Sequence, residues 1–144
     1  MKKIEFELSI QNINLYYIVV MTLGMTTTVA IFQKSLSEPW FSLIKLGLKT
    51  CEGRLKKGDF SNMVVGDYII FENSDFDIKR TIKVEITDIS YYDTFYSYLE
   101  SETLTKCLPG IDTLSEGLAV YYKYFSIADE INNGIVAIKI KMIK

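Results

Sequence analysis

The sequence predicts a single small domain of the α+β class. A chain of 144 residues has the length of one domain. With 49% apolar residues it can bury a core without disulfides or metals. Apolar and polar residues alternate over 81–89 (TIKVEITDI), as in a half-buried strand, whereas 94–102 has apolar residues at helical spacing. Similar short segments of both kinds follow one another along the chain without a repeat or a linker.

The composition excludes several classes of site. The chain contains no histidine, which removes Ser-His and Cys-His nucleophilic pairs and histidine zinc sites. Cys51 and Cys107 lie far apart and match no metal-ligand or redox spacing. We therefore expect two reduced thiols, no metal site, no cofactor and a cytoplasmic protein.

The N-terminal segment allows two interpretations. No charged residue occurs from Leu8 to Phe32, Lys2 and Lys3 precede it, and residues 13–32 are long enough to span a membrane. Its threonines, β-branched residues and aromatics instead suit two buried strands separated near Gly24. Membrane association through 13–32 stays the alternative to the two strands.

The character of the chain changes near Met25. Read from there, the sequence resembles the start of a soluble domain, so residues 1–24 could be an appended extension or arise from an upstream start codon. We accordingly divide the chain into an N-terminal apolar extension, 1–28, and a domain over 29–144.

The first half of the domain begins with a strand over 29–36. Ser37 is a good helix N-cap, Pro39 suits a first helical turn, and Gly47 ends the short apolar helix between them. Residues 48–55 are too short and mixed for another helix and are expected to form a strand or extended loop.

The elements of the second half of the domain are predicted from the turn signals that separate them. Glycine, asparagine and aspartate clusters at 56–59, 65–67, 73–75 and 132–134 separate the remaining elements. Between them we expect a hairpin of strands 68–72 and 81–89, helices over 94–102 and 115–125, a loop at 108–110, and a last strand over 135–142.

Basic residues are concentrated in one segment. Lys45, Lys49, Arg54, Lys56 and Lys57 lie within thirteen residues that contain one acid, Glu52. Such a segment beside a glycine-bearing loop can contact phosphate. The alternative is that Lys56 and Lys57 only keep a turn in solvent.

Residues 48–55 also predict how side chains divide between two faces. In an extended chain, Thr50, Glu52 and Arg54 point to one side, and Lys49 and Cys51 to the other, unless Gly53 introduces a kink. Charged groups crowded between buried elements are usually paired or directed into a cleft. Both a Glu52–Arg54 ion pair and a ligand site remain open.

The segment 40–55 (WFSLIKLGLKTCEGRL) resembles the opening of ASCH domains (activating signal cointegrator homology). These show a helix with proline and aromatic residues, a glycine, and a Lys-Thr-x-Glu-x-Arg element, here residues 49–54. Residues 66–71 resemble the Gly-Asp turn and strand of the family. The resemblance continues in order through 81–90, 92–99, 108–110, 121–125 and 134–140, and covers about residues 31–143.

The resemblance implies a small PUA-like β-barrel with short helices covering its ends. It also implies an intracellular domain that binds single-stranded RNA, a nucleotide or a nucleoside in a basic groove over residues 49–54. Lys49, Thr50, Glu52 and Arg54 would then face the ligand, and we add Lys56 and Lys57 from the basic segment.

Some bacterial members of the family are amidohydrolases acting on acetylated cytidine. They use a lysine, a threonine three residues later and a downstream glutamate. Lys49 matches the first, Glu52 stands in place of the threonine, and Glu100 or Glu102 lies near the third. The alternative function is therefore a small hydrolase of modified nucleosides or RNA using Lys49 and Glu52. A protein-interaction module is a third class.

Aromatic residues form two clusters, 91–98 and 121–125, that could stack on bases. At helical spacing most of them, like Trp40, are expected to lie in the core. Tyr91, Tyr92 and Tyr122 are the candidates for exposure beside the groove.

Overall fold

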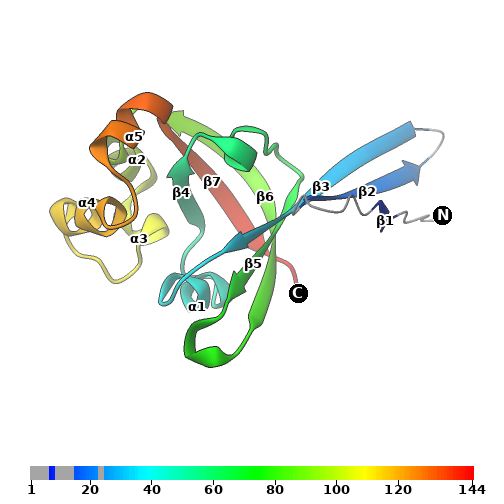
Figure 1. Ribbon diagram of the computed structural model, residues 1–144, viewed down its shortest axis with the longest axis horizontal. Coiled ribbons are helices and arrows are strands. Elements are labelled where there is room, and N and C mark those ends of the chain that lie inside the picture. The colour runs from blue at the N-terminus through cyan, green and yellow to red at the C-terminus, as the bar shows by residue number, and fades with distance from the viewer. Residues whose placement is uncertain (1–6, 9–14, 23–24) are drawn as a thin grey trace.

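The computed structural model describes residues 7–8, 15–22 and 25–144 (Figure 1). Its strands are β1 (Glu7–Leu8), β2 (Leu15–Thr22), β3 (Met25–Ser35), β4 (Cys51–Leu55), β5 (Tyr68–Asn73), β6 (Arg80–Tyr92) and β7 (Ile135–Met142). Its helices are α1 (Trp40–Lys45), α2 (Phe95–Glu102), α3 (Leu104–Cys107), α4 (Leu114–Tyr122) and α5 (Ile127–Asn133), with 3-10 turns η1 (Gly58–Ser61) and η2 (Asp75–Asp77). The predicted α+β class is confirmed.

The strands form one mixed sheet in the order β1-β2-β3-β5-β6-β7-β4. Neighbouring strands are antiparallel except β3 and β5, which run parallel. Within the described residues no ladder joins β4 to β3, so the sheet is open and a closed barrel is not confirmed. A closed barrel would need a backbone ladder between β4 and β3. These strands are instead joined by a side-chain contact, in which Arg54 Nη2 donates to the carbonyl oxygen of Ser35 at 3.2 Å.

On the N-terminal side of the sheet, β2 and β3 form a hairpin, which projects from the rest of the molecule in Figure 1. Thr22 pairs with Met25, so the two strands meet where the sequence predicted, while the turn at 23–24 lies outside the described residues. No helix in the described ranges has the length and apolar character needed to cross a membrane. The division at residue 28 stays a prediction; β3 runs across it and pairs with β5 from Ile31 onward.

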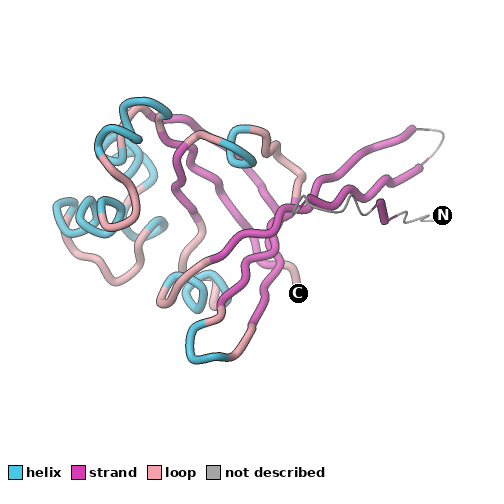
Figure 2. Tube along the Cα trace, in the orientation of Figure 1, coloured by secondary structure: helices cyan, strands magenta, loops and turns pink. Residues whose placement is uncertain are grey.

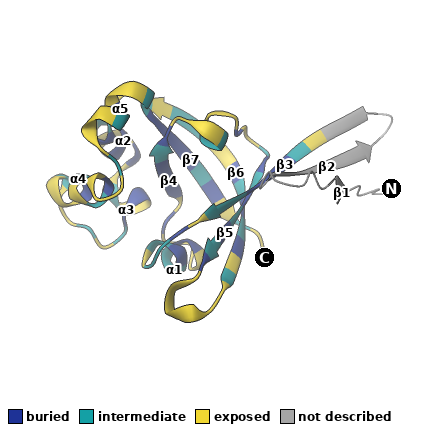
Figure 3. Ribbon diagram, viewed as in Figure 1, coloured by how far each residue is buried: buried dark blue, intermediate teal, exposed yellow. Residues whose placement is uncertain are grey.

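Strand β7 separates two cores. Val136, Ile138 and Ile140 pack in a cluster with β5, β6 and α1, whereas Ile135 and Ala137 pack with α2, α3 and α4. Figure 2 shows α2–α5 grouped together and α1 apart from them, and Figure 3 shows β7 buried along most of its length. This alternation follows from the two-residue period of a strand whose two faces are both covered.

The helices differ most from the sequence-based expectations. The first begins at Trp40 rather than directly after Ser37. The helix predicted over 115–125 is α4, which begins at Leu114 because Thr113 and Glu116 form a reciprocal capping box. Short helices α3 and α5 were not predicted; they contain four and seven residues, too few to show a clear helical period. Cys51 and Cys107 are buried free thiols.

Candidate ligand-binding cleft

A cleft of about 590 Å³ opens between the free edge of β4 and the ends of β3 and β5. The loop after β3 and residues of α4 and its following turn complete its walls. The lining residues are Ser35, Leu36, Ser37, Trp40, Lys49, Glu52, Gly53, Arg54, Glu72, Asn73, Ser74, Asp75, Leu108, Val120, Tyr121, Tyr124 and Phe125. The cleft therefore lies over the predicted segment 49–54, and apolar walls meet polar groups there, as in many small-molecule sites.

Three of the predicted site residues form one charged cluster in this cleft. Glu52 Oε1 accepts a hydrogen bond from Arg54 Nε at 2.8 Å, and Glu52 Oε2 lies 3.2 Å from Lys49 Nζ. Glu52 and Arg54 thus form the ion pair that the sequence left open as one alternative, and the pair lines a cleft; a ligand site there stays a prediction. Arg54 is partly exposed and also lies over the ring of Phe60, 5.1 Å from its centroid.

Lys49 lies on the same side as Glu52, which corrects the sorting of faces predicted for an extended 48–55. Strand β4 begins only at Cys51, so strand alternation does not apply to Lys49. Its side chain is buried, and Nζ donates to the carbonyl oxygens of Cys51 (2.7 Å) and Cys107 in addition to its pair with Glu52. These acceptors use all three hydrogens of the ammonium group.

Glu52 is buried but charged. Burial alone would raise the pKa of its carboxyl, but the charges and hydrogen bonds of Lys49 and Arg54 outweigh that effect and hold the pKa below its ordinary value. Glu52 is consequently an anion at neutral pH that fixes the position of both cations. This arrangement presents the guanidinium of Arg54 to the cleft in one orientation.

The other predicted contacts lie outside the cleft lining. Thr50 is exposed; its backbone N–H donates to Lys106 O and its carbonyl accepts from Ile140 N. Lys57 is exposed before η1. Lys56 lies over Tyr91, with Nζ 4.3 Å from the ring centroid, and both line a second hollow with Asn133 and Gly134. The basic segment is thus divided between different surfaces.

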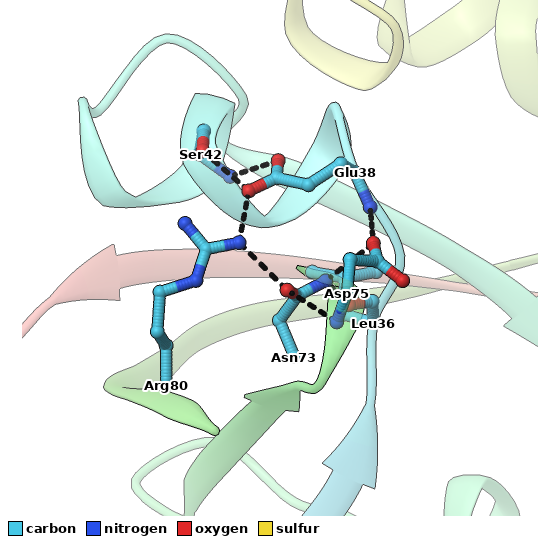
Figure 4. Close-up of polar contacts among 6 residues, drawn as sticks. All are labelled: Leu36, Glu38, Ser42, Asn73, Asp75 and Arg80. Carbon is cyan, nitrogen blue, oxygen red and sulfur yellow. Dashed lines mark hydrogen bonds and ion pairs between the residues drawn. The ribbon is translucent and has the colours of Figure 1, made fainter. Parts of the chain in front are cut away.

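The opposite wall of the cleft was not predicted. Figure 4 shows Arg80 between Glu38 and Asn73: its Nη2 donates to Glu38 Oε1 and to Asn73 Oδ1, both at 2.6 Å. Asn73 Nδ2 donates to the carbonyl of Leu36 (2.9 Å) and to Asp75 Oδ2 (2.8 Å). This network ties the end of β5 to the loop after β3 and positions Asp75 at the cleft.

Asp75 also receives the backbone N–H of Glu38 on Oδ2 at 3.0 Å. That hydrogen bond, followed by the one from Asn73, lowers the pKa of Asp75 below its ordinary value. The sequence signal for this wall was the polar run Asn73-Ser74-Asp75, which we interpreted only as a strand breaker.

The charges of the lining correct the expectation of a basic groove. Lys49 and Arg54 face three carboxylates, those of Glu52, Glu72 and Asp75. The lining is therefore not net positive. The physical reason is that two of these carboxylates, Glu72 and Asp75, come from β5 and its following turn, distant in sequence from the basic segment.

The aromatic side chains of the cleft also differ from those expected. Trp40 lines the cleft instead of lying wholly in the core, and Tyr124, 61% exposed, lies at its mouth with its hydroxyl 3.3 Å from that of Ser37. Tyr91 and Tyr92 line the second hollow. Tyr122 is exposed, but its hydroxyl donates to Glu130.

Of the residues of the hydrolytic alternative, Lys49 and Glu52 lie together in the cleft, whereas the downstream glutamates do not line it. Glu100 is exposed, and Glu102 lies outside the lining, where its carboxylate accepts from Tyr92 OH at 2.7 Å. The ammonium group of Lys49 is paired with three acceptors, and Thr50 is exposed outside the cleft lining. The hydrolytic alternative therefore stays a prediction. In the described part of the chain no group of three or more His, Cys, Asp or Glu side chains could hold a metal ion.

Comparisons with known proteins identify the family of the chain and structures with a similar fold. The family model of the ASCH domain matches residues 35–144. The crystal structure of hypothetical protein PH0355 is similar with a TM-score of 0.71 and 34% sequence identity, covering 78% of this chain and 99% of that one. The solution NMR structure of protein PF0455 from Pyrococcus furiosus is similar with a TM-score of 0.65 and 33% identity, covering 79% and 98% respectively. No curated protein matches the chain.

Proposed function

Because the chain belongs to the ASCH domain family, we propose that its cleft binds RNA or a nucleotide by taking one base between its walls. The family suggests RNA binding in general. The cleft is large enough for a base and ribose, since small-ligand sites begin at about 300 Å³ and this one measures about 590 Å³.

The observation that carries the proposal is the fixed guanidinium of Arg54 beside aromatic walls. Two of its nitrogens are engaged, Nε by Glu52 and Nη2 by Ser35 O, while Nη1 has no hydrogen-bond partner within the described part of the chain. A planar donor held in place suits a base acceptor or a phosphate oxygen. Trp40 and Tyr124 supply aromatic surface on which a base can stack.

The charge of the lining predicts how such binding depends on salt. Arg54 is the one lining cation that retains a donor for a ligand, because Lys49 is fully paired. Each phosphate contact on a single strand contributes a slope of about −0.7 in log affinity against log salt. We therefore expect a slope of about −1 or shallower, much less than for a protein that binds along the phosphate backbone.

The test is binding of fluorescent single-stranded RNA and of nucleoside monophosphates to the full chain at two salt concentrations. Arg54→Ala is compared with Lys57→Ala, which removes one cation outside the cleft. Tyr124→Ala is compared with Tyr91→Ala, since these tyrosines are similarly exposed, 61% and 54%. We expect each cleft variant to weaken binding at least tenfold, by about 1.4 kcal/mol, and each control to leave it nearly unchanged.

Two outcomes would overturn the proposal. Equal losses in Arg54→Ala and Lys57→Ala would mean that the RNA binds by general surface charge. Negligible binding of every RNA and nucleotide by the wild-type chain would remove nucleic acid as the ligand of the cleft.

A further inference from the structure

The free edge of β4 presents backbone groups to the cleft at one residue, Gly53. Backbone bonds join Ile140 N to Thr50 O and Lys56 N to Gly134 O, on either side of the β4·β7 ladder. In an antiparallel ladder alternate residues face the partner strand. Residues 50, 52, 54 and 56 therefore face β7, and the N–H and C=O groups of Cys51, Gly53 and Leu55 point to the free edge.

Gly53 is the position on this edge where both backbone groups are open. The carbonyl of Cys51 accepts from Lys49 Nζ at 2.7 Å, and that of Leu55 accepts from Lys57 N at 2.9 Å. By the alternation of the ladder neither the N–H nor the C=O of Gly53 bonds to β7, and no loop or side-chain group of the described ranges bonds to either, although Gly53 is buried and lines the cleft. Buried backbone groups are usually paired, so an N–H and a C=O that are both open at one buried residue favour a ligand that supplies both partners.

We propose that the backbone of Gly53 recognises the ligand. Its N–H donates to an acceptor atom of a planar ring, and its C=O accepts from the adjacent donor of the same ring. This deepens the proposed function and rests on it. A nucleobase has an acceptor and a donor on neighbouring atoms of its Watson–Crick edge, and single-stranded RNA leaves that edge free. Arg54 and the aromatic walls would hold the remainder of the nucleotide.

The same edge does not suit an extended peptide. A peptide added as a strand needs backbone partners at successive alternate residues. Here the carbonyls of Cys51 and Leu55, the next alternate positions on either side, are already engaged. A ligand that contacts one residue of the edge fits this pattern, and a strand does not.

The absence of a side chain at Gly53 has a separate structural cause. A Cβ there would lie 2.5 Å from Cζ of the buried Tyr98, on the face away from Arg54. Glycine is therefore needed at this position for packing against Tyr98. Because a substitution would disturb that packing, the role of the Gly53 backbone is tested by changing the ligand.

The experiment uses ¹⁵N-labelled full chain and the four nucleoside 5′-monophosphates as probes. The amide of Gly53 and the indole N–H of Trp40 are followed by NMR during titration. Each nucleotide that binds is then compared with a form in which methylation removes every hydrogen of the donor nitrogen, for example uridine with 3-methyluridine monophosphate or adenosine with N6,N6-dimethyladenosine monophosphate. We expect a downfield shift and slower hydrogen exchange of the Gly53 amide, and about tenfold weaker binding of the methylated form.

The outcomes separate the two proposals. If Trp40 shifts but the Gly53 amide does not, and methylation leaves the affinity unchanged, the backbone inference is wrong while nucleotide binding in the cleft stands. If neither signal responds to any of the four nucleotides or to single-stranded RNA, nucleic-acid binding in the cleft fails and the inference fails with it.

Discussion

The carboxylate of Glu52 lies 3.2 Å from the ammonium of Lys49, and both side chains are almost fully buried, with exposed fractions of 7% and 1%. An ion pair removed from water is stable only when further hydrogen bonds compensate its lost hydration. Here Arg54 and the carbonyls of Cys51 and Cys107 supply them. Lys49 thus holds β4 and α3 together.

Replacing Lys49 should accordingly destabilise the fold. Lys49→Met leaves two carbonyl oxygens and one side of the Glu52 carboxylate without a donor, at an expected cost of about 3–5 kcal/mol. Chemical denaturation measures the loss, and the exposed Lys57→Met should stay within about 0.5 kcal/mol of wild type. A similar small effect for both variants would contradict a bridging role for Lys49.

Glu52 should make stability depend on pH in acid. Its folded pKa is lowered, so its contribution is complete above the unfolded value of about 4.3 and is lost as the pH falls through the folded pKa. The free energy of unfolding is measured for wild type and Glu52→Gln across this range. The advantage of wild type should be constant above about pH 5 and shrink below about pH 4. A difference that grows on acidification would show that the folded pKa is raised.

Gly53→Ala should be destabilising because of one neighbour. The new methyl group would overlap the ring of Tyr98, which is fully buried, and overpacking of this kind costs about 1–3 kcal/mol. A double-mutant cycle with Tyr98→Leu checks the cause. The cost of Gly53→Ala should fall in the Tyr98→Leu background, whereas an unchanged cost would place the strain in the backbone.

Asn73→Ala should loosen the far wall of the cleft. Asn73 is buried and contacts Leu36 O, Asp75 and Arg80, so its removal should cost about 2–3 kcal/mol. It should also weaken ligand binding, since Asp75 loses its support. The control is Asn62→Ala, because Asn62 is exposed with one long side-chain contact of 3.4 Å to Gly58 O. Equal stability of the two variants would contradict this role of Asn73.

Patterns within one element were predictable from the sequence. Alternating residues gave β6 and β7, and the charged run 49–54 indicated Lys49, Glu52 and Arg54 as cleft residues. The face of Lys49 was predicted wrongly because β4 begins two residues later. Helix α5 was missed although Ser126 caps it, since seven residues show less than two turns of periodicity.

Features that depend on tertiary arrangement were not predictable. Asp75 and Tyr124 reach the cleft only because the turn after β5 and the end of α4 meet the loop after β3. No local pattern records which loops become neighbours. The open groups of Gly53 likewise depend on β4 being the last strand of the sheet, and the chain order of the strands does not show this.

The shared position of β7 between the two cores has a consequence for folding cooperativity. Val136, Ile138 and Ile140 stabilise one core, and Ile135 and Ala137 stabilise the other, so opening either half exposes apolar side chains of β7. Amides in the middle of β7 should therefore exchange only through global unfolding, at the full free energy of the domain. One wall of the cleft comes from each half of the molecule. Strand β7 would then hold the two walls in a fixed relative position, although none of its residues lines the cleft.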